Sequence, residues 1–459
     1  MLSRISVQNF LSVDRKVEFS MLASKESQHL ERVAHGDGFP ARLLQTAAIW
    51  GANASGKSNF TKVFAFAHFL VVHGTRPDRP TGRSPFKLRA SAAIEPSIFE
   101  FDIVVEFEGE ERMFRYGFGV TNREVTEESL VEIRPVTNRI YFTRKSGGDG
   151  AEAVFTLEWW ERKVVSDDDR TFAKVLAKGT RPNQLFLHEA MDRNLTLLAP
   201  IFRWFRDQLV VLDPSADYFA LETIEEERQD LREFVAMMLN CADTGVESIA
   251  AEPVQVESIG ISQGIKENIL NELKEGGTGM LLRLPNRRRY SLFVKDGELN
   301  ASRIVTYRQT AEGKKVPFES SEESDGTLRL FDLSPLFYEL ASPKSRKVYI
   351  IDELDRSMHT QLTAALLQNY YNSRSADTRA QLIFTTHDVQ LMTQELFRRD
   401  ETWFMERGPH GEMNMECLCD HKDVRYDKDV RKAYLEGRLT GVPHLKPFGR
   451  RTIRSAEPT

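Results

Sequence analysis

The sequence predicts an α/β fold of two lobes, split by an α-rich insertion and accompanied by an antiparallel β subdomain. Three observations support this prediction. A short apolar run at residues 43–50 precedes an amphipathic helix pattern. Residues 101–120 alternate in polarity on both sides of a glycine turn, as in an antiparallel hairpin. Alternation of strands and helices returns from Val316 onward, after a middle part of different character.

The N-terminal lobe is assigned to residues 1–135. Ile5 and Val7 alternate with polar neighbours and predict a half-buried strand. Residues 57–73 predict a helix, because apolar residues recur there at three- and four-residue spacing: Phe60, Val63, Phe64, Ala67, Leu70 and Val71. The hairpin follows, with alternating apolar residues on each side of its turn: Phe101, Ile103, Val105 and Phe107, then Phe114, Tyr116, Phe118 and Val120.

The insertion is assigned to residues 136–300 and the C-terminal lobe to residues 301–459. Helices are expected at 184–208, at 221–239 and around 265–273, after a glycine-rich turn at 147–150 and an acidic loop at 167–169. No apolar heptad persists for three or four repeats, which excludes a long coiled-coil arm.

Composition limits the class of protein. The chain has 459 residues, a formal net charge of −6 and three cysteines. A slightly acidic chain is not expected to coat nucleic acid over its whole surface, although a local basic groove remains open. Three cysteines are too few for a disulfide framework, and no segment approaches the length of a membrane helix. We therefore expect a cytoplasmic protein without a membrane partner.

A phosphate-binding loop is the strongest motif. Residues 51–58 read GANASGKS, which matches G-x-x-x-x-G-K-[ST] between an apolar strand and a helix. Backbone N–H groups of such a loop surround phosphates, the lysine reaches the β- and γ-phosphates, and the serine hydroxyl binds Mg²⁺. ATP and Mg²⁺ are thus the expected ligands, and the nucleotide-binding residues in this loop are Gly51, Asn53, Ser55, Gly56, Lys57, Ser58 and Asn59.

Two further strand ends carry polar side chains. Residues 348–351 form an apolar run that ends in Asp352 and Glu353. We expect Asp352, with Ser58, to hold Mg²⁺, and Glu353 to polarise the attacking water. Residues 381–386 form a second such run, followed by His387, which is expected to hydrogen-bond a γ-phosphate. The expected catalytic residues are therefore Lys57, Glu353 and His387.

The spacing of these motifs indicates a split domain. Lys57 and Asp352 are 295 residues apart, far more than a compact mononucleotide-binding unit needs. Together with the histidine after the acidic pair, this spacing resembles the ABC-type ATPases of the SMC, RecF and OLD group. The resemblance implies an ABC-type P-loop NTPase head that forms a head-to-head dimer or a higher homo-oligomer.

The same resemblance implies a signature motif before the acidic strand. Residues 323–331 read ESDGTLRLF, and Ser324 and Gly326 would face the γ-phosphate bound to a second subunit. A helix N-cap followed by a glycine is the alternative interpretation. Asp355 would occupy the D-loop, which lies across the dimer interface and continues to Ser357 and His359. A glutamine of the Gln-loop cannot be placed.

Eight motifs narrow the resemblance to the stand-alone, OLD-like ATPases of bacterial defence islands. This group includes the ATPase subunits of the PARIS (AriA) and Septu (PtuA) anti-phage systems, and AriA is preferred partly on length. The motifs are NFLSV, WGANASGKSN, PFKL, CADTGV, ESDGTLRL, IIDELDRSMH, FTTHD and YLEGRLTGVP, in that order. The resemblance implies a separate effector, a Toprim or HNH nuclease, and a phage-derived trigger. About seventy residues follow His387, too few for a Toprim domain within this chain.

Two weaker patterns and two alternative functions stay open. Cys417, Cys419 and His421 alternate as on an ordinary strand and fit a tetrahedral zinc site poorly. Residues 287–289 are three arginines, which form either a solvated hairpin or a contact for phosphates or an acidic protein.

A RecF-like DNA repair ATPase is the alternative function, and the net charge gives it no support. A further alternative is an ATP-dependent scaffold with dispensable hydrolysis.

Overall fold

The computed structural model describes residues 1–36, 41–147, 153–161, 166–214, 229–274, 279–285, 287–421 and 429–443. Within these ranges, no helix combines the length and the apolar character that crossing a membrane requires. The end of the predicted C-terminal lobe, residues 444–459, lies outside the described residues, as do the glycines at 148 and 150 of the predicted turn.

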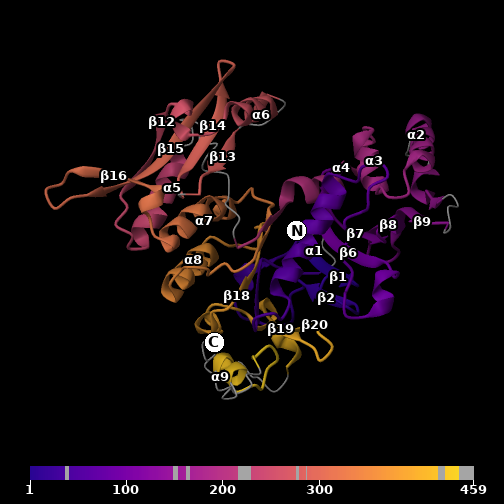
Figure 1. The fold of residues 1–459 in the computed structure, drawn as a ribbon. Helices are drawn as coiled ribbons and strands as arrows, with labels where there is room; N and C mark the ends of the chain where they lie inside the picture. Colours follow the sequence, from indigo (N-terminus) through magenta and orange to yellow (C-terminus); the bar gives the residue numbers. More distant parts are fainter. Residues whose placement is uncertain are drawn as a thin grey trace, which may run out of the picture.

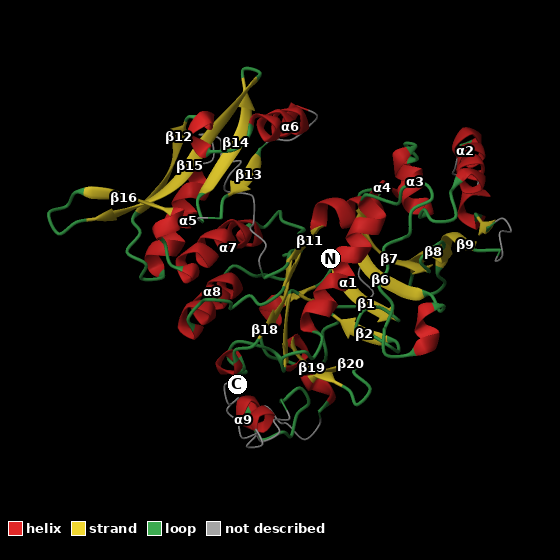
Figure 2. Cartoon of the chain, in the orientation of Figure 1, coloured by secondary structure: helices red, strands yellow, loops and turns green. Residues whose placement is uncertain are grey.

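A six-stranded sheet forms the centre of the molecule (Figures 1 and 2). Five of its strands are parallel, and the last pairs antiparallel with its neighbour. In spatial order the strands are β11 (Leu209–Leu212), β17 (Val348–Ile351), β18 (Gln381–Thr386), β5 (Thr46–Gly51), β19 (Thr402–Arg407) and β20 (Met413–Cys417). Strands from both ends of the chain thus lie side by side, as the spacing of the motifs predicts.

Both faces of this sheet are covered, as a parallel sheet requires. Along β5, Ala47 and Ile49 join a core that includes α1 (Lys57–Val72) and the antiparallel subdomain. The alternate residues Ala48 and Trp50 join a second core on the opposite face. That second core is closed by helices α5 (Gln229–Cys241), α7 (Asp325–Ala341), α8 (Thr360–Asn372) and α9 (Val430–Leu435).

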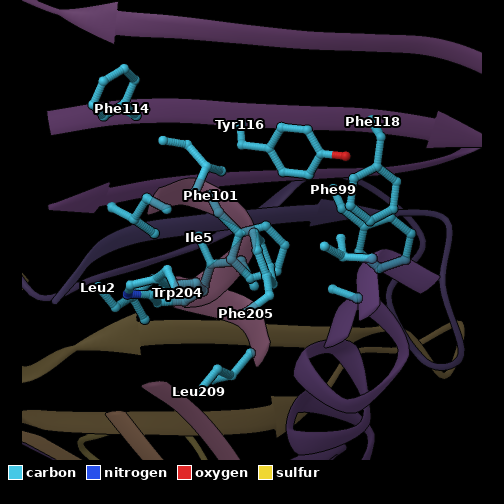
Figure 3. Close-up of a cluster of buried hydrophobic side chains, with 14 of the residues drawn as sticks. Leu2, Ile5, Phe99, Phe101, Phe114, Tyr116, Phe118, Trp204, Phe205 and Leu209 are labelled. Carbon is cyan, nitrogen blue, oxygen red and sulfur yellow. The ribbon is translucent and has the colours of Figure 1, made fainter. Parts of the chain in front are cut away.

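The antiparallel subdomain is a seven-stranded sheet that contains the predicted hairpin. Its strands, in spatial order, are β10 (Val154–Thr156), β9 (Arg139–Lys145), β8 (Val125–Ile133), β7 (Glu110–Val120), β6 (Ser97–Phe107), β1 (Leu2–Gln8) and β2 (Val17–Ser20). One face carries an aromatic cluster, shown in Figure 3, in which Phe205 packs against Phe101 and Tyr116 at ring distances of 5.2 and 5.7 Å. This cluster attaches the subdomain to the central sheet. A two-stranded ribbon of β3 (Val33–Ala34) and β4 (Leu43–Leu44) lies outside both sheets.

The predicted helix at 184–208 is three shorter pieces. They are α3 (Phe186–Asp192), α4 (Ala199–Arg203) and a π-helical turn at Trp204–Gln208. Asn194 has a left-handed backbone (φ 61°), and Pro200 occupies the first turn of α4, so the helix cannot continue through either position. The expected acidic loop at 167–169 is instead the first turn of α2 (Asp167–Gly179), where Ser166 Oγ accepts the N–H of Asp169 at 3.0 Å.

The segment expected to be α-rich contributes strands as well as helices. Beyond β9, β10 and β11, it supplies most of a five-stranded antiparallel sheet, which we call the inserted sheet. The predicted short helix is present as α6 (Gln263–Lys274), and the described part of the helix expected at 221–239 is α5. The strands of the inserted sheet are β12 (Ser248–Val254), β13 (Met280–Arg283), β14 (Arg289–Lys295), β15 (Glu298–Gln309) and β16 (Lys315–Glu319).

Candidate nucleotide-binding site

The phosphate-binding loop joins the C-terminal end of β5 to α1, as predicted. Two of its glycines are required by geometry. A Cβ on Gly51 would lie 2.3 Å from the carbonyl oxygen of Met405 on β19. Gly56 has φ 110°, and its Cβ would lie 2.9 Å from both Met413 and Ser12. The loop is therefore shaped by the strands and by the N-terminal segment that pack around it.

Lys57 is folded back onto this loop. Its ammonium donates to the carbonyl oxygen of Gly51 at 2.6 Å and to that of the next residue at 3.0 Å. The residue is only 5% exposed, and burial lowers the pKa of Lys57 to about 8, against the opposing effect of Asp352, Glu353 and Asp355. Lys57 therefore remains largely charged at neutral pH and interacts with three carboxylates from the other end of the chain.

Asp352 follows β17 and is almost fully buried, with 1% of its surface exposed. Its Oδ1 accepts the hydroxyl hydrogen of Thr385 at 2.6 Å. Its Oδ2 is buried and has no hydrogen-bond partner in the described part of the chain. A buried carboxylate oxygen left unsatisfied is costly, so this atom is suited to a cation or to a water bound to one.

Glu353 and His387 lie together at the ends of adjacent strands. Glu353 Oε1 is 3.3 Å from His387 Nε2, and both side chains are about one-third exposed (33% and 39%). The N–H of Glu353 donates to Thr385 Oγ1 at 2.8 Å, and Glu353 has a left-handed backbone with φ 51°. The strained backbone and this hydrogen bond set the direction of the carboxylate.

The signature turn begins α7. Ser324 is exposed, and its Oγ accepts the N–H of Thr327 at 3.1 Å, so Ser324 is an N-cap, as in the alternative interpretation of this motif. Gly326 lies against the D-loop, since a Cβ there would be 2.7 Å from the carbonyl oxygen of Ser357. Among the described residues, no hydrogen bond or ion pair joins Ser324 or Gly326 to residues 51–58.

Asp355 occupies the same D-loop segment. Burial raises the pKa of its carboxyl, and a hydrogen bond with Thr386 opposes that rise. Asp355 Oδ1 is buried and lacks a hydrogen-bond partner among the described residues. The charge of Asp355 acts on Lys57, while Ser357, two residues later, packs against Gly326 of the signature turn.

Comparison with known proteins places the chain in a family. Residues 47–177 and 206–393, more than half of the sequence, match the family described as "AAA domain, putative AbiEii toxin, Type IV TA system". The chain belongs to this AbiEii-type AAA family. The matched ranges include the P-loop, the signature turn, the acidic strand end and His387, so the P-loop ATPase fold predicted from the sequence is confirmed.

Two solved structures are similar to this AbiEii-type protein over most of its length. The SMC head domain from Thermotoga maritima is 14% identical, with a TM-score of 0.35, covering 91% of this chain and 98% of that one. A structure described as the SmcHead bound to the C-winged helix domain of ScpA is 13% identical, with a TM-score of 0.37, covering 91% and 97%. No curated protein matches the sequence.

The structure brings together most of the site residues predicted for this AbiEii-type protein. Lys57, Asp352, Glu353, Asp355 and His387 form one group, linked by the contacts and electrostatic interactions described above. Ser58 and Asn59 lie in the first turn of α1, and Asn53 and Ser55 lie in the loop before it, where Ser55 Oγ is buried without a partner among the described residues. Within the described ranges, no hydrogen bond or ion pair joins Ser324 or Gly326 to this group.

Sequence reasoning assigned no role to Thr385, which joins Asp352 to Glu353 through one hydroxyl. It also gave none to Arg329, whose guanidinium donates to the carbonyl oxygen of Glu353 at 3.2 Å. Thr385 could have been found from its position two residues before His387 at a strand end. No sequence pattern pointed to a role for Arg329, because it lies within an ordinary helix pattern.

The segment with Cys417, Cys419 and His421 is not the single strand that the alternation predicts. Cys417 ends β20, and Cys419 lies in a short 3₁₀ turn after it. Over the described ranges, no group of three or more His, Cys, Asp or Glu residues could hold a metal. All three cysteines are free thiols.

Proposed function

We propose that this protein binds ATP with Mg²⁺ at the P-loop and hydrolyses it. The observation that carries the proposal is the group of Lys57, Asp352, Glu353 and His387, with the buried and unpartnered Oδ2 of Asp352 beside it. This combination supplies a cation for phosphates, a hard oxygen ligand, a carboxylate base and a hydrogen-bond donor.

In this proposal the loop at 51–59 holds the triphosphate. Backbone N–H groups at the start of α1 point toward the β- and γ-phosphates. The Lys57 ammonium exchanges its two carbonyl acceptors for phosphate oxygens, which relieves part of its burial penalty. Ser58 and Asp352 provide the oxygen ligands for Mg²⁺, which neutralises charge on the phosphates when bound.

Glu353 orients water for attack on the γ-phosphorus. As the new P–O bond forms, the bond to the ADP oxygen breaks and a water proton passes to the Glu353 carboxylate. His387 lies 3.3 Å from that carboxylate in the free protein, and its ring N–H turns to a γ-phosphate oxygen when ATP binds. Thr385 fixes the backbone from which the carboxylate projects.

We further propose that the complete site needs two chains in a head-to-head dimer. Ser324 is exposed, and among the residues that the structure describes its side chain hydrogen-bonds only within its own helix turn, so its face is open to a second nucleotide. Gly326 lets that turn approach the D-loop closely. The signature of one subunit would then contact the γ-phosphate held by the other.

On the resemblance to stand-alone OLD-like ATPases, we propose that this cycle gates a separate effector, such as a Toprim or HNH nuclease, in an anti-phage system. A PARIS-type subunit is the preferred assignment within that group. Salt-sensitive binding of the isolated protein to long duplex DNA would instead favour a repair ATPase that binds DNA directly.

Nucleotide titration and phosphate release test the activity. Lys57→Ala is expected to abolish ATP binding, whereas Lys62→Ala, an exposed lysine one turn later on α1, leaves it unchanged. Glu353→Gln is expected to bind ATP and to lose at least ~100-fold in hydrolysis, while Glu257→Gln, in the 3₁₀ turn that follows β12, has no effect. Unchanged nucleotide binding in Lys57→Ala would contradict the proposed site.

A further inference from the structure

A charged cavity lies between the inserted sheet and the start of α7. Its volume is about 420 Å³, within the range of small-molecule sites. None of the P-loop residues line it. The lining includes five arginines drawn from three parts of the chain: Arg283, Arg287, Arg289, Arg329 and Arg356.

Two aspartates offset part of this positive charge. Asp332 accepts from Arg289 at 3.0 Å and lies 3.9 Å from Arg283, so it neutralises the inner end of the cavity. Asp325 pairs with Arg287 at 2.8 Å, but both side chains are more than half exposed, and such a pair is weak. Five arginines and two aspartates leave a formal charge of +3 on the lining.

Arg329 gives the cavity an unsatisfied donor. The residue is only 7% exposed, and its Nε has no hydrogen-bond partner among the described residues. One of its other nitrogens donates to the carbonyl oxygen of Glu353. A buried guanidinium with an unused N–H is costly, and an anionic acceptor in the cavity would remove that cost.

We infer that this cavity is a second phosphate-binding site, which takes the polyphosphate group of a nucleotide or a related ligand. Planar guanidinium groups match the oxygens of phosphate in pairs, and several of them around one cavity favour a ligand with more than one phosphate. Arg329 connects the cavity to the backbone of Glu353, so occupancy can act on the proposed catalytic carboxylate. The inference stands independently of the proposed ATPase activity.

Pyrophosphate binding to the full-length Lys57→Ala chain tests the site without the P-loop. Calorimetry is expected to give saturable binding of one pyrophosphate per chain. Arg287→Ala and Arg356→Ala, added singly to that chain, are expected to weaken it about tenfold each, since each removes one charge-assisted contact. Both residues are exposed, so neither change disturbs the core.

Arg288→Ala is the matched control. Arg288 neighbours Arg287 on the same hairpin and pairs with Glu319, but it does not line the cavity. Its removal is expected to leave pyrophosphate binding unchanged. Equal weakening in Arg287→Ala and Arg288→Ala would overturn the inference, because it would show general charge attraction rather than a site.

Two binding experiments, or arms, distinguish a free ligand in the cavity from a nucleotide held by a second copy of the chain. Saturable binding by dilute Lys57→Ala chain supports a free ligand. Binding that appears only in the chain with intact Lys57, with ATP and at rising protein concentration, would overturn the inference, because it would belong to the two-chain ATP site proposed above and not to a separate one. If Arg287→Ala and Arg356→Ala change neither arm, the inference is wrong, whether or not ATP is hydrolysed at the P-loop.

Discussion

The hydroxyl of Thr385 donates to Asp352 Oδ1 at 2.6 Å and accepts the N–H of Glu353 at 2.8 Å. One side chain on β18 therefore orients both carboxylate residues that follow β17. Because the two strands are adjacent and parallel, their C-terminal ends place Thr385 and Asp352 at the same edge of the sheet. That leaves Asp352 Oδ2 free to face a ligand while its partner oxygen is held.

Thr385→Val is expected to lower ATP hydrolysis about 10–100-fold, with a smaller loss of nucleotide affinity. Effects of this size are typical when a residue that hydrogen-bonds a metal-binding side chain is removed. Valine keeps the volume but removes both hydrogen bonds. Steady-state phosphate release and nucleotide titration measure the two effects separately. Thr385→Ser retains the hydroxyl and should recover most of the rate. Equal rates for valine and serine would show that the hydroxyl has no role.

ATP affinity is expected to fall as the pH rises above 8. Burial lowers the pKa of Lys57 to about 8 in the free protein, and the phosphates bind the charged form. Above that pH the protein must take up a proton on binding, so the association constant should decrease by up to about tenfold per pH unit. Calorimetry from pH 7 to 9.5 measures this. Lys57→Met should bind weakly with no such slope, and a parallel slope in that variant would refute the assignment.

Gly326→Ala is expected to destabilise the protein by about 1–3 kcal/mol, since its Cβ would lie 2.7 Å from the carbonyl oxygen of Ser357. The same change should separate the signature turn from the D-loop and weaken any ATP-dependent dimer. Gly264→Ala on α6 is the control, because nothing lies within 4 Å of its Cβ position. Denaturant unfolding compares the two, and similar midpoints would contradict the close approach.

Glu401 predicts a pH dependence of stability. Burial raises the pKa of this carboxyl to about 8 in the folded protein, against a value of 4.5 without the fold. The folded state thus keeps a proton that the unfolded chain releases, so the free energy of unfolding falls as the pH rises from about 4.5 to 8. Glu401→Gln should remove this slope and raise the thermal midpoint at pH 8 but not at pH 4. A variant as pH-sensitive as the parent would contradict the shift.

Local motifs predicted the strand, loop and helix at residues 46–72 because their geometry is fixed by short-range constraints. The P-loop glycines, the strand before them and α1 follow from sequence alone, and the alternative interpretation of Ser324 as an N-cap also matches the structure. The hairpin of β6 and β7 was equally clear from its alternation.

The remaining features depend on tertiary contacts that leave no local pattern. The strands β12 to β16 are only partly buried, so their sequences lack the strong alternation of β6, and helix content was overestimated there. Strand β11 pairs with β17 across more than 130 residues of chain. Arg329 acquires its position only when α7 packs beside the D-loop.

Mixing two inactive variants tests the two-chain site most directly. We consider a symmetric dimer in which the P-loop of one chain faces the signature of the other. A heterodimer of one Lys57→Ala chain and one Ser324→Arg chain then has both defects in one site, and its second site is intact. An equal mixture should then recover about a quarter of the parent rate, while Lys57→Ala with Glu353→Gln recovers none. If neither mixture recovers phosphate release, the site is not shared between chains in this way.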